Sequence, residues 1–258
     1  MADLLLKNLP PTVVELPSDE LGGASGARLF HVLAVGKANT EAYPYSVANE
    51  KIASEIGRAL GLAIPEVLLY RLSREWVAFS CFVEQTESGE AAPSGTALQI
   101  ESYYQSHPEE LHGMICFDLF IGNNDRKTDN LILGEDGVVR LIDHANSLFY
   151  RPTSSTEAGI ARLLAIQQNL SALFDKPHWF LEGLESWELV DEWCKRIEAL
   201  PSYFIRSVVN NLPSGILKDE ERQTVIEFLT TRKYLMPSII ETNLSLFPNL
   251  HTRGGQDT

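Results

Sequence analysis

The chain has 258 residues, with 21 Lys or Arg against 35 Asp or Glu, and a formal net charge of −14. Nucleic-acid binders and proteins that dock on anionic membranes need clustered basic residues, and the sequence has no such run, so both classes are disfavoured. Hydrophobic residues make up 44% of the chain, enough for one large core or two modest ones. We expect a folded protein of one or two domains.

The three cysteines, Cys81, Cys116 and Cys194, are far apart and have apolar neighbours. Because their number is odd and no C-x-x-C pair occurs, the pattern favours buried thiols over a disulfide framework or a zinc site. The N-terminal segment has too short an apolar run for a signal peptide, and no stretch reaches the roughly 18 apolar residues of a membrane span. We expect a cytoplasmic protein without a membrane partner.

Residues 1–85 predict a small, strand-rich domain that contains one helix. A glycine-rich stretch, residues 21–27, precedes the first expected strand. The strands are expected at Leu29–Lys37, Glu66–Leu72 and Trp76–Val83. The helix is expected to begin with Ser46 as its N-cap and to end at Gly61, a typical glycine of the C′ position.

Residues 86–96 are small and polar, which is typical of a linker or hinge. Residues 97–250 predict a larger helical domain, and residues 251–258 a frayed tail. The helices of the larger domain are expected at Pro108–Gly122, Glu157–Phe174, Trp187–Leu200, Ser202–Asn211, Lys218–Tyr234 and Pro237–Leu246. The first of these is almost wholly apolar in its second half, so it should lie inside the domain.

The segment between residues 123 and 144 contains the candidate catalytic and metal-binding residues. Asp136-Gly137 predicts a two-residue type I′ hairpin turn. In that register Asn130 lies directly opposite Asp143, with Cβ atoms about 4.5–5.5 Å apart. One carboxylate and one amide oxygen form a partial magnesium site, because Mg²⁺ prefers few protein oxygens and keeps positions for water and phosphate. We therefore predict Asn130 and Asp143 as metal ligands.

Asp125 precedes Asn130 by five residues, and Asp143 follows thirteen residues after Asn130. This is the D-x-x-x-x-N arrangement of kinase catalytic loops, followed by a metal-binding aspartate. Lys127 lies two positions after Asp125 and is expected to reach the transferred phosphoryl group. Arg126 is expected to brace the loop from beneath.

A kinase of this type also needs a lysine near the end of an N-lobe strand, for the ATP phosphates, and a helix glutamate that orients the lysine. Lys37 and Glu50 occupy those places in the sequence. Val35 lies two residues before Lys37, on the same strand face, and is expected to lie against adenine.

Residues 117–130, FDLFIGNNDRKTDN, resemble the catalytic loop of the HipA-like kinases and, more distantly, the D-R-H-x-x-N loop of phosphatidylinositol 3/4-kinases. Residues 141–144, LIDH, are similar to the metal-binding motif that follows in HipA-like proteins. Asn49-Glu50, together with residues 60–65, resembles the N-lobe helix of that family and its exit. The resemblance spans residues 22–246.

The resemblance implies an α+β, bilobal protein-kinase-like fold that binds ATP and Mg²⁺, with a small strand-rich N-lobe and a larger helical C-lobe. It implies that Asp125 is the base or the hydroxyl-orienting group and that Lys37 holds the ATP phosphates. Gly23 and Gly26 belong to the irregular glycine-rich segment expected at the nucleotide. The chain departs from other kinases in lacking the H-R-D, D-F-G and A-P-E motifs, and Lys127 replaces the histidine of the lipid-kinase loop.

The leading functional hypothesis is transfer of the ATP γ-phosphoryl group to a hydroxyl, preferably of Ser or Thr in a protein substrate. The alternatives are a nucleotide-binding pseudokinase that docks onto a partner, a small-molecule or lipid kinase, and a metal-dependent phosphate-ester hydrolase. A regulatory protein partner is left open. Because the net charge is −14, nucleotide binding requires local positive charge, expected from Lys37, Arg126, Lys127 and Mg²⁺.

Overall fold

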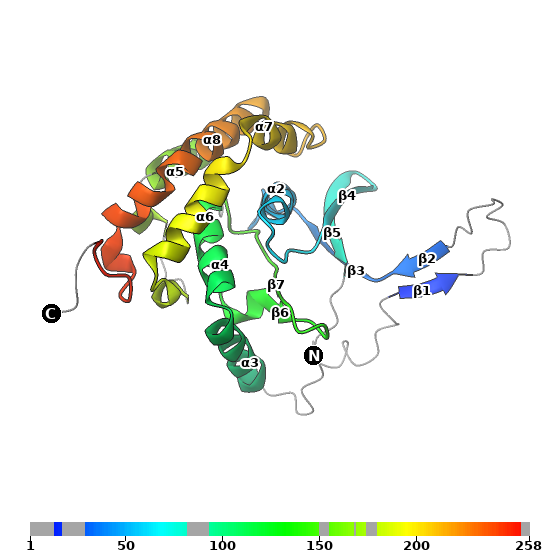
Figure 1. The fold of residues 1–258 in the computed structure, drawn as a ribbon. Coiled ribbons are helices and arrows are strands. Elements are labelled where there is room, and N and C mark those ends of the chain that lie inside the picture. The colour runs from blue at the N-terminus through cyan, green and yellow to red at the C-terminus, as the bar shows by residue number, and fades with distance from the viewer. Residues whose placement is uncertain are drawn as a thin grey trace.

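In a computed structural model of the chain, the structure describes residues 13–16, 29–81, 93–149, 155–167, 169–173 and 180–253. A strand-rich N-terminal part lies beside a larger helical part, and a hairpin formed by β6 (Leu131–Leu133) and β7 (Val139–Leu141) lies between the helices and the strands (Figure 1). The predicted nucleotide-binding glycines, Gly23 and Gly26, lie outside the described residues.

The N-terminal part contains two separate antiparallel sheets. β1 (Val13–Leu16) pairs with β2 (Leu29–Val32), and this ribbon projects away from the remainder (Figure 1). The second sheet has the order β3-β5-β4. Its strands are β3 (Ala34–Ala38), β4 (Val67–Leu72) and β5 (Glu75–Cys81). The single strand expected at Leu29–Lys37 is therefore two strands that separate at Leu33 and join different sheets.

α2 (Ser46–Ala59) packs against this second sheet and contributes most of the N-terminal core. The sequence predicted Ser46 as the N-cap of α2, but Tyr45 occupies that position and makes no side-chain capping hydrogen bond. Instead Asn39, in the preceding loop, accepts a hydrogen bond from Val47 N at 2.9 Å and satisfies one free amide of the first turn. Gly61 ends the helix in the left-handed region with φ 85°, as expected for a C′ glycine.

The helical part begins with a helix that the sequence analysis missed, α3 (Pro93–Ser106). Four residues of the expected linker, 93–96, belong to this helix, and residues 86–92 lie outside the described ranges. α4 (Pro108–Ile121) matches its predicted bounds, and its last ten residues, 112–121, are all buried. α4 packs against α6 and α8, so it forms the centre of the helical part (Figure 1).

Of the remaining long helices, two pack against α4 and the other two pack against α8. They are α5 (Thr156–Ile166), α6 (Trp187–Ala199), α7 (Ser202–Asn210) and α8 (Asp219–Thr242). Helix α5 is shorter than predicted, and a separate 3-10 turn follows at Leu170–Ala172. The helices expected at residues 218–234 and 237–246 are one helix, with Pro237 inside α8. Met236 and Ile240, on either side of this proline, are fully buried, so packing maintains the helix across Pro237.

The hairpin β6 (Leu131–Leu133) and β7 (Val139–Leu141) has a different register from the predicted one. Leu131 pairs with Leu141, so Asn130 lies opposite Ile142. The carbonyl of Asn130 accepts a hydrogen bond from Ile142 N at 3.0 Å. A type I′ turn needs positive φ at both central residues, but only Gly137, at φ 74°, has it in this loop. The connection is therefore a three-residue loop, and the expected opposition of Asn130 and Asp143 is wrong by one residue.

Gly113 tests the packing of α4 against α6. A Cβ at Gly113 would lie 2.2 Å from Cζ2 of Trp193. Alanine normally stabilises a helix relative to glycine by up to about 1 kcal/mol. Here we expect Gly113→Ala to lower the free energy of unfolding by about 1–3 kcal/mol, because the indole ring must shift. Urea unfolding should show less than additive losses for the Gly113→Ala/Trp193→Leu pair, and stabilisation by Gly113→Ala alone would contradict the packing.

Candidate active site

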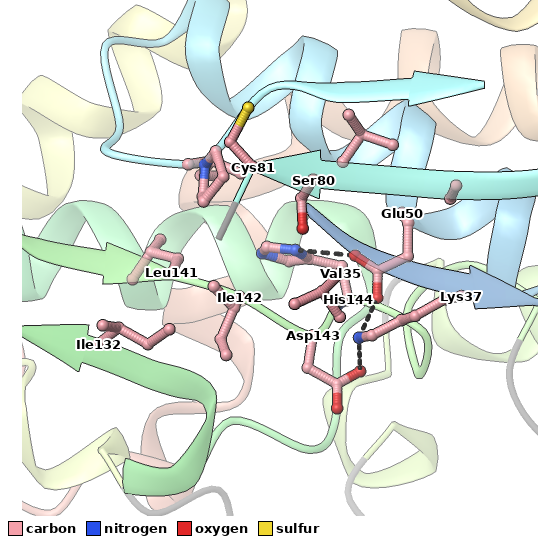
Figure 2. A pocket seen from close by; sticks show the side chains of 14 residues that line it. Val35, Lys37, Glu50, Ser80, Cys81, Ile132, Leu141, Ile142, Asp143 and His144 are labelled. Atoms are coloured by element: carbon pink, nitrogen blue, oxygen red, sulfur yellow. Dashed lines mark hydrogen bonds and ion pairs between the residues drawn. The ribbon is translucent and has the colours of Figure 1, made fainter. Parts of the chain in front are cut away.

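A cavity of about 230 Å³ lies where the N-terminal sheet faces the hairpin β6–β7 (Figure 2). Its walls are mainly apolar. The sheet contributes Val35, Val67 and Ala78, and the hairpin region contributes Ile132, Leu141 and Ile142. Lys37, Glu50 and Asp143 line the same cavity and bring its charged groups together. A flat, apolar slot beside a cluster of charges suits a ligand with an aromatic ring and an anionic group.

Lys37 connects three segments that are distant in the sequence. Its Nζ donates to Glu50 Oε1 at 2.6 Å and to Asp143 Oδ1 at 2.8 Å. Strand alternation places Val35 and Lys37 on one face of β3, and both line the cavity. Burial lowers the pKa of Lys37, but the charges of Glu50 and Asp143 outweigh it and raise that pKa above its ordinary value. Lys37 is therefore a fully charged cation.

Glu50 lies on the buried side of α2, with only 6% of its surface exposed. Besides Lys37, it accepts a hydrogen bond from His144 N at 3.1 Å on Oε1, and His144 Nδ1 lies 3.7 Å from Oε2 (Figure 2). Burial raises the pKa of Glu50, but its interactions with His144 and Lys37 outweigh burial and lower the pKa to about 2. The carboxylate thus remains ionised and orients the lysine.

Asp143 has a left-handed backbone, with φ 57°. A residue other than glycine in this region costs on the order of 1 kcal/mol, and such residues concentrate at functional sites. The neighbouring ladder ends at Leu141, so residues 142–144 leave the hairpin at this point. This conformation accompanies the contact between the Asp143 carboxylate and Lys37.

The predicted catalytic loop follows the end of α4, where Gly122 caps the helix with φ 66°. Asp125 is half-buried and held at two points: its carbonyl accepts from Asn130 Nδ2 at 2.5 Å, and its Oδ2 accepts from Asn146 Nδ2 at 2.8 Å. Lys127 is half-buried; its carbonyl accepts from Asn130 N at 3.0 Å, but its side-chain ammonium has no hydrogen-bond or ion-pair partner within the described part of the chain. The loop therefore presents a fixed carboxylate and an unpaired cation two residues apart.

Arg126 braces this loop from inside, as the sequence predicted. It is 1% exposed, and its Nε and Nη2 donate to the two carboxylate oxygens of Asp118 at 2.8 and 2.9 Å. Its Nη1 donates to the carbonyls of Asn130 at 3.0 Å and Ile142 at 2.8 Å. The expectation that Arg126 adds positive charge to the cleft is wrong, because Asp118 neutralises it in the core.

The cysteines differ from the expectation at one position. Cys116 and Cys194 are buried free thiols, as predicted, whereas Cys81 is exposed and lines the cavity at the end of β5. Contact with Cys194 and burial raise the pKa of the Cys116 thiol. His144 is 1% exposed, and its ring packs edge-on against Phe117, so it is a core histidine.

Two asparagines at the site were not predicted. Asn49 Nδ2 donates to the carbonyls of Ala145 and Phe149, at 2.9 and 3.1 Å, and Asn146 contacts Asp125. Asn49 precedes Glu50 and Asn146 follows Asp143 by three residues. In the sequence, Asn49 belongs to the segment that resembles the N-lobe helix of the HipA-like kinases, and the only signal for Asn146 is its proximity to Asp143; neither signal specifies a partner.

Comparison with known proteins identifies the fold. No protein-family model and no curated protein matches the sequence. Among solved structures, the chain is similar to the Helicobacter pylori proinflammatory kinase CtkA, with 15% identity and a TM-score of 0.53, over 83% of this chain and 91% of that one. HipA of Shewanella oneidensis MR-1, solved with HipB and operator DNA, matches with 12% identity and a TM-score of 0.45, over 92% of this chain and 70% of that one.

The chain therefore has an α+β fold similar to that of the kinase CtkA, with a small N-terminal sheet and a larger helical part, and the sequence analysis predicted this fold class. None of the helices in the described ranges combines the length and the apolar character that crossing a bilayer requires.

The buried pair of Arg126 and Asp118 gives a prediction on stability. Asp118→Asn leaves the Arg126 guanidinium buried without its counter-ion, so we expect the free energy of unfolding to fall by about 3–5 kcal/mol. Urea denaturation measures this change. The matched control is Asp136→Asn, which breaks the Asp136–Arg140 pair on the surface and should change stability little. Equal effects of the two substitutions would contradict the assignment.

Glu50 gives a prediction on pH dependence. Its pKa is about 2 in the folded protein and 4.5 ordinarily, so the unfolded chain binds this proton more tightly. The carboxylate therefore contributes stability above about pH 4.5, of about 3 kcal/mol, which is lost as the pH falls toward 2. Glu50→Gln lacks this contribution. We expect the stability difference between wild type and variant to shrink across that window in urea titrations, and parallel curves would refute the shift.

Proposed function

We propose that the protein is an ATP- and Mg²⁺-dependent phosphotransferase that moves the γ-phosphoryl group to a hydroxyl, preferably of Ser or Thr in a protein. The observation that carries the proposal is the double pairing of Lys37 with Glu50 and Asp143 beside an apolar slot. Protein kinases require such a lysine, oriented by a helix glutamate and close to a metal-binding aspartate, to hold nucleotide phosphates.

The slot and Lys37 suit the two ends of ATP. Val35 and the apolar side chains opposite it offer a dry space for adenine, and the charged end of the cavity faces the phosphates. Lys37 would contribute its charge to the phosphates while Glu50 keeps it oriented. Because the Glu50 carboxylate is ionised and buried away from water, it can hold the Lys37 ammonium in one orientation.

Asn130 and Asp143 fit a magnesium site. They supply one amide and one carboxylate group, which suits an ion that keeps other positions for water and phosphate. Asn130 uses its Nδ2 on Asp125 O, and among the described residues no hydrogen bond engages its Oδ1. Bound Mg²⁺ would supply charge neutralisation at the phosphates. Arg126 holds the carbonyls of Asn130 and Ile142, and so fixes the backbone beside both ligands.

Asp125 and Lys127 suit the acceptor side. Asp125 would orient the acceptor hydroxyl and take its proton, and Lys127 would stabilise the charge that develops on the transferred group. Lys127 can act in this way because its side-chain ammonium has no other partner within the described residues. A protein acceptor is favoured over a lipid because the chain carries net charge −14 and lacks a basic run that would attract an anionic membrane.

The test is transfer of labelled γ-phosphate, including autophosphorylation, by wild type, Asp125→Ala, Asp143→Asn and Lys37→Met. We expect Asp125→Ala to lower the rate by about 10²–10⁴-fold, the usual contribution of a general base. Asp143→Asn and Lys37→Met should also weaken ATP binding. The control is Asp191→Asn, which removes a surface carboxylate paired with Arg253. Equal labelling in all five proteins would refute the assignment.

Two other outcomes would identify the alternative functions. Thermal stabilisation by ATP and Mg²⁺ without any transfer would indicate a nucleotide-binding pseudokinase. Release of phosphate from ester substrates without ATP would indicate a hydrolase.

A further inference from the structure

Asn146 is buried beside the predicted base. It is 6% exposed, and its Nδ2 donates to Asp125 Oδ2 at 2.8 Å. Its Oδ1 is buried and has no hydrogen-bond partner among the residues that the structure describes. The alternative amide orientation would turn an oxygen toward a carboxylate oxygen, so the donor must face Asp125. An asparagine whose other polar atom is unsatisfied is retained here at a cost in stability, which points to the bond with Asp125 as its purpose.

The position of Asn146 is fixed by a tight turn. Ser147 donates from N and Oγ to His144 O, at 3.0 and 2.5 Å, and Leu148 N donates to Ile121 O at 2.9 Å. These bonds anchor the turn to the end of α4. Since α4 also leads into the loop that contains Asp125, the donor and the acceptor carboxylate stand on one rigid support.

The N-terminal part also holds this turn. Asn49 of α2 donates to the carbonyls of Ala145 and Phe149, on both sides of Asn146, and is itself fully buried. Glu50, the next residue of α2, accepts from His144 N. A single turn of α2 therefore fixes the turn that orients Asp125.

We propose that Asn146 is a positioning residue for phosphoryl transfer, held in place by Asn49 and acting only through Asp125; this inference rests on the proposed function. Asn146 anchors Oδ2, which leaves Oδ1 of Asp125 for the acceptor hydroxyl. In the reaction the hydroxyl proton moves to Asp125, the hydroxyl oxygen bonds to the γ-phosphorus, and the bond from that phosphorus to the leaving ADP oxygen breaks. Asn146 keeps the carboxylate in line for that proton and contacts neither ATP nor acceptor.

The decisive substitution is Asn146→Asp, which keeps the shape and replaces the donor with a second carboxylate. In the full chain we expect the kcat of phosphoryl transfer to fall by about 10–100-fold, the usual effect of losing a supporting hydrogen bond. KM for ATP and the ATP dissociation constant should stay within about twofold of wild type, because Asn146 does not line the cavity. The matched control is Asn211→Asp on the surface, with thermal melting as the check on folding.

A double-mutant cycle separates positioning from a structural role. If Asn146 acts through Asp125, then Asp125→Ala/Asn146→Asp should transfer phosphate at the same rate as Asp125→Ala alone. Additive losses would overturn the proposal, as would a kcat of Asn146→Asp equal to that of Asn211→Asp. If wild type transfers no phosphate, the proposed function fails and this inference falls with it. If wild type transfers and Asp125→Ala does not, an unaffected Asn146→Asp refutes the inference alone.

Should Asn146→Asp fail to fold, Asn146→Ser provides the same test. Serine is too short to reach Asp125 but adds no charge, and the same loss of kcat with unchanged ATP affinity is expected. A kcat equal to that of wild type would refute the proposal.

Discussion

The ion pair between Arg126 and Asp118 is the constraint on which the site depends. Two opposite charges lie in the apolar centre of the helical part, where an unpaired charge would cost several kcal/mol. The guanidinium makes four hydrogen bonds: two to the carboxylate of Asp118, and two from Nη1 to the carbonyls of Asn130 and Ile142. The predicted catalytic loop and the segment leading to Asp143 are therefore held by a single side chain, and the burial that makes the pair costly also makes it rigid.

A net charge of −14 conflicts with the proposed phosphate ligand, and Lys37 alone does not remove the conflict, because its single charge is outnumbered by the two carboxylates that it contacts. Its two carboxylate partners lie within 2.8 Å, whereas most other charges are distant and screened by salt. Arg126 contributes nothing to this local field, so the positive charge for the proposed phosphate ligand must come from Lys37, Lys127 and a bound cation. The overall charge thus says little about the cavity, and local geometry decides what it can bind.

Lys37, Glu50 and Asp143, which the sequence proposed as site residues, lie at one cavity, but the register of the neighbouring hairpin differs from the predicted one. The spacing of Asp125, Asn130 and Asp143 follows from a loop chemistry that tolerates few changes, so motif and fold agree. The hairpin register could not be predicted, because the choice between a two-residue and a three-residue turn depends on the φ of Asp136, which the dipeptide Asp-Gly does not specify. Pro237 was similarly misleading, since its local preference to end a helix is overridden by core contacts on both sides.

Asn49 and Glu50 show why the site spans both parts of the molecule. Consecutive helix residues point about 100° apart, so one turn of α2 can hold two points of the segment after Asp143. Glu50 orients Lys37 and accepts a hydrogen bond from His144 N, while Asn49 donates hydrogen bonds to the carbonyls on both sides of Asn146. A displacement of α2 would disturb Lys37, the segment of the proposed metal ligand Asp143 and the orientation of Asp125 together. The three groups that the proposed phosphoryl transfer requires are therefore assembled by the position of one helix.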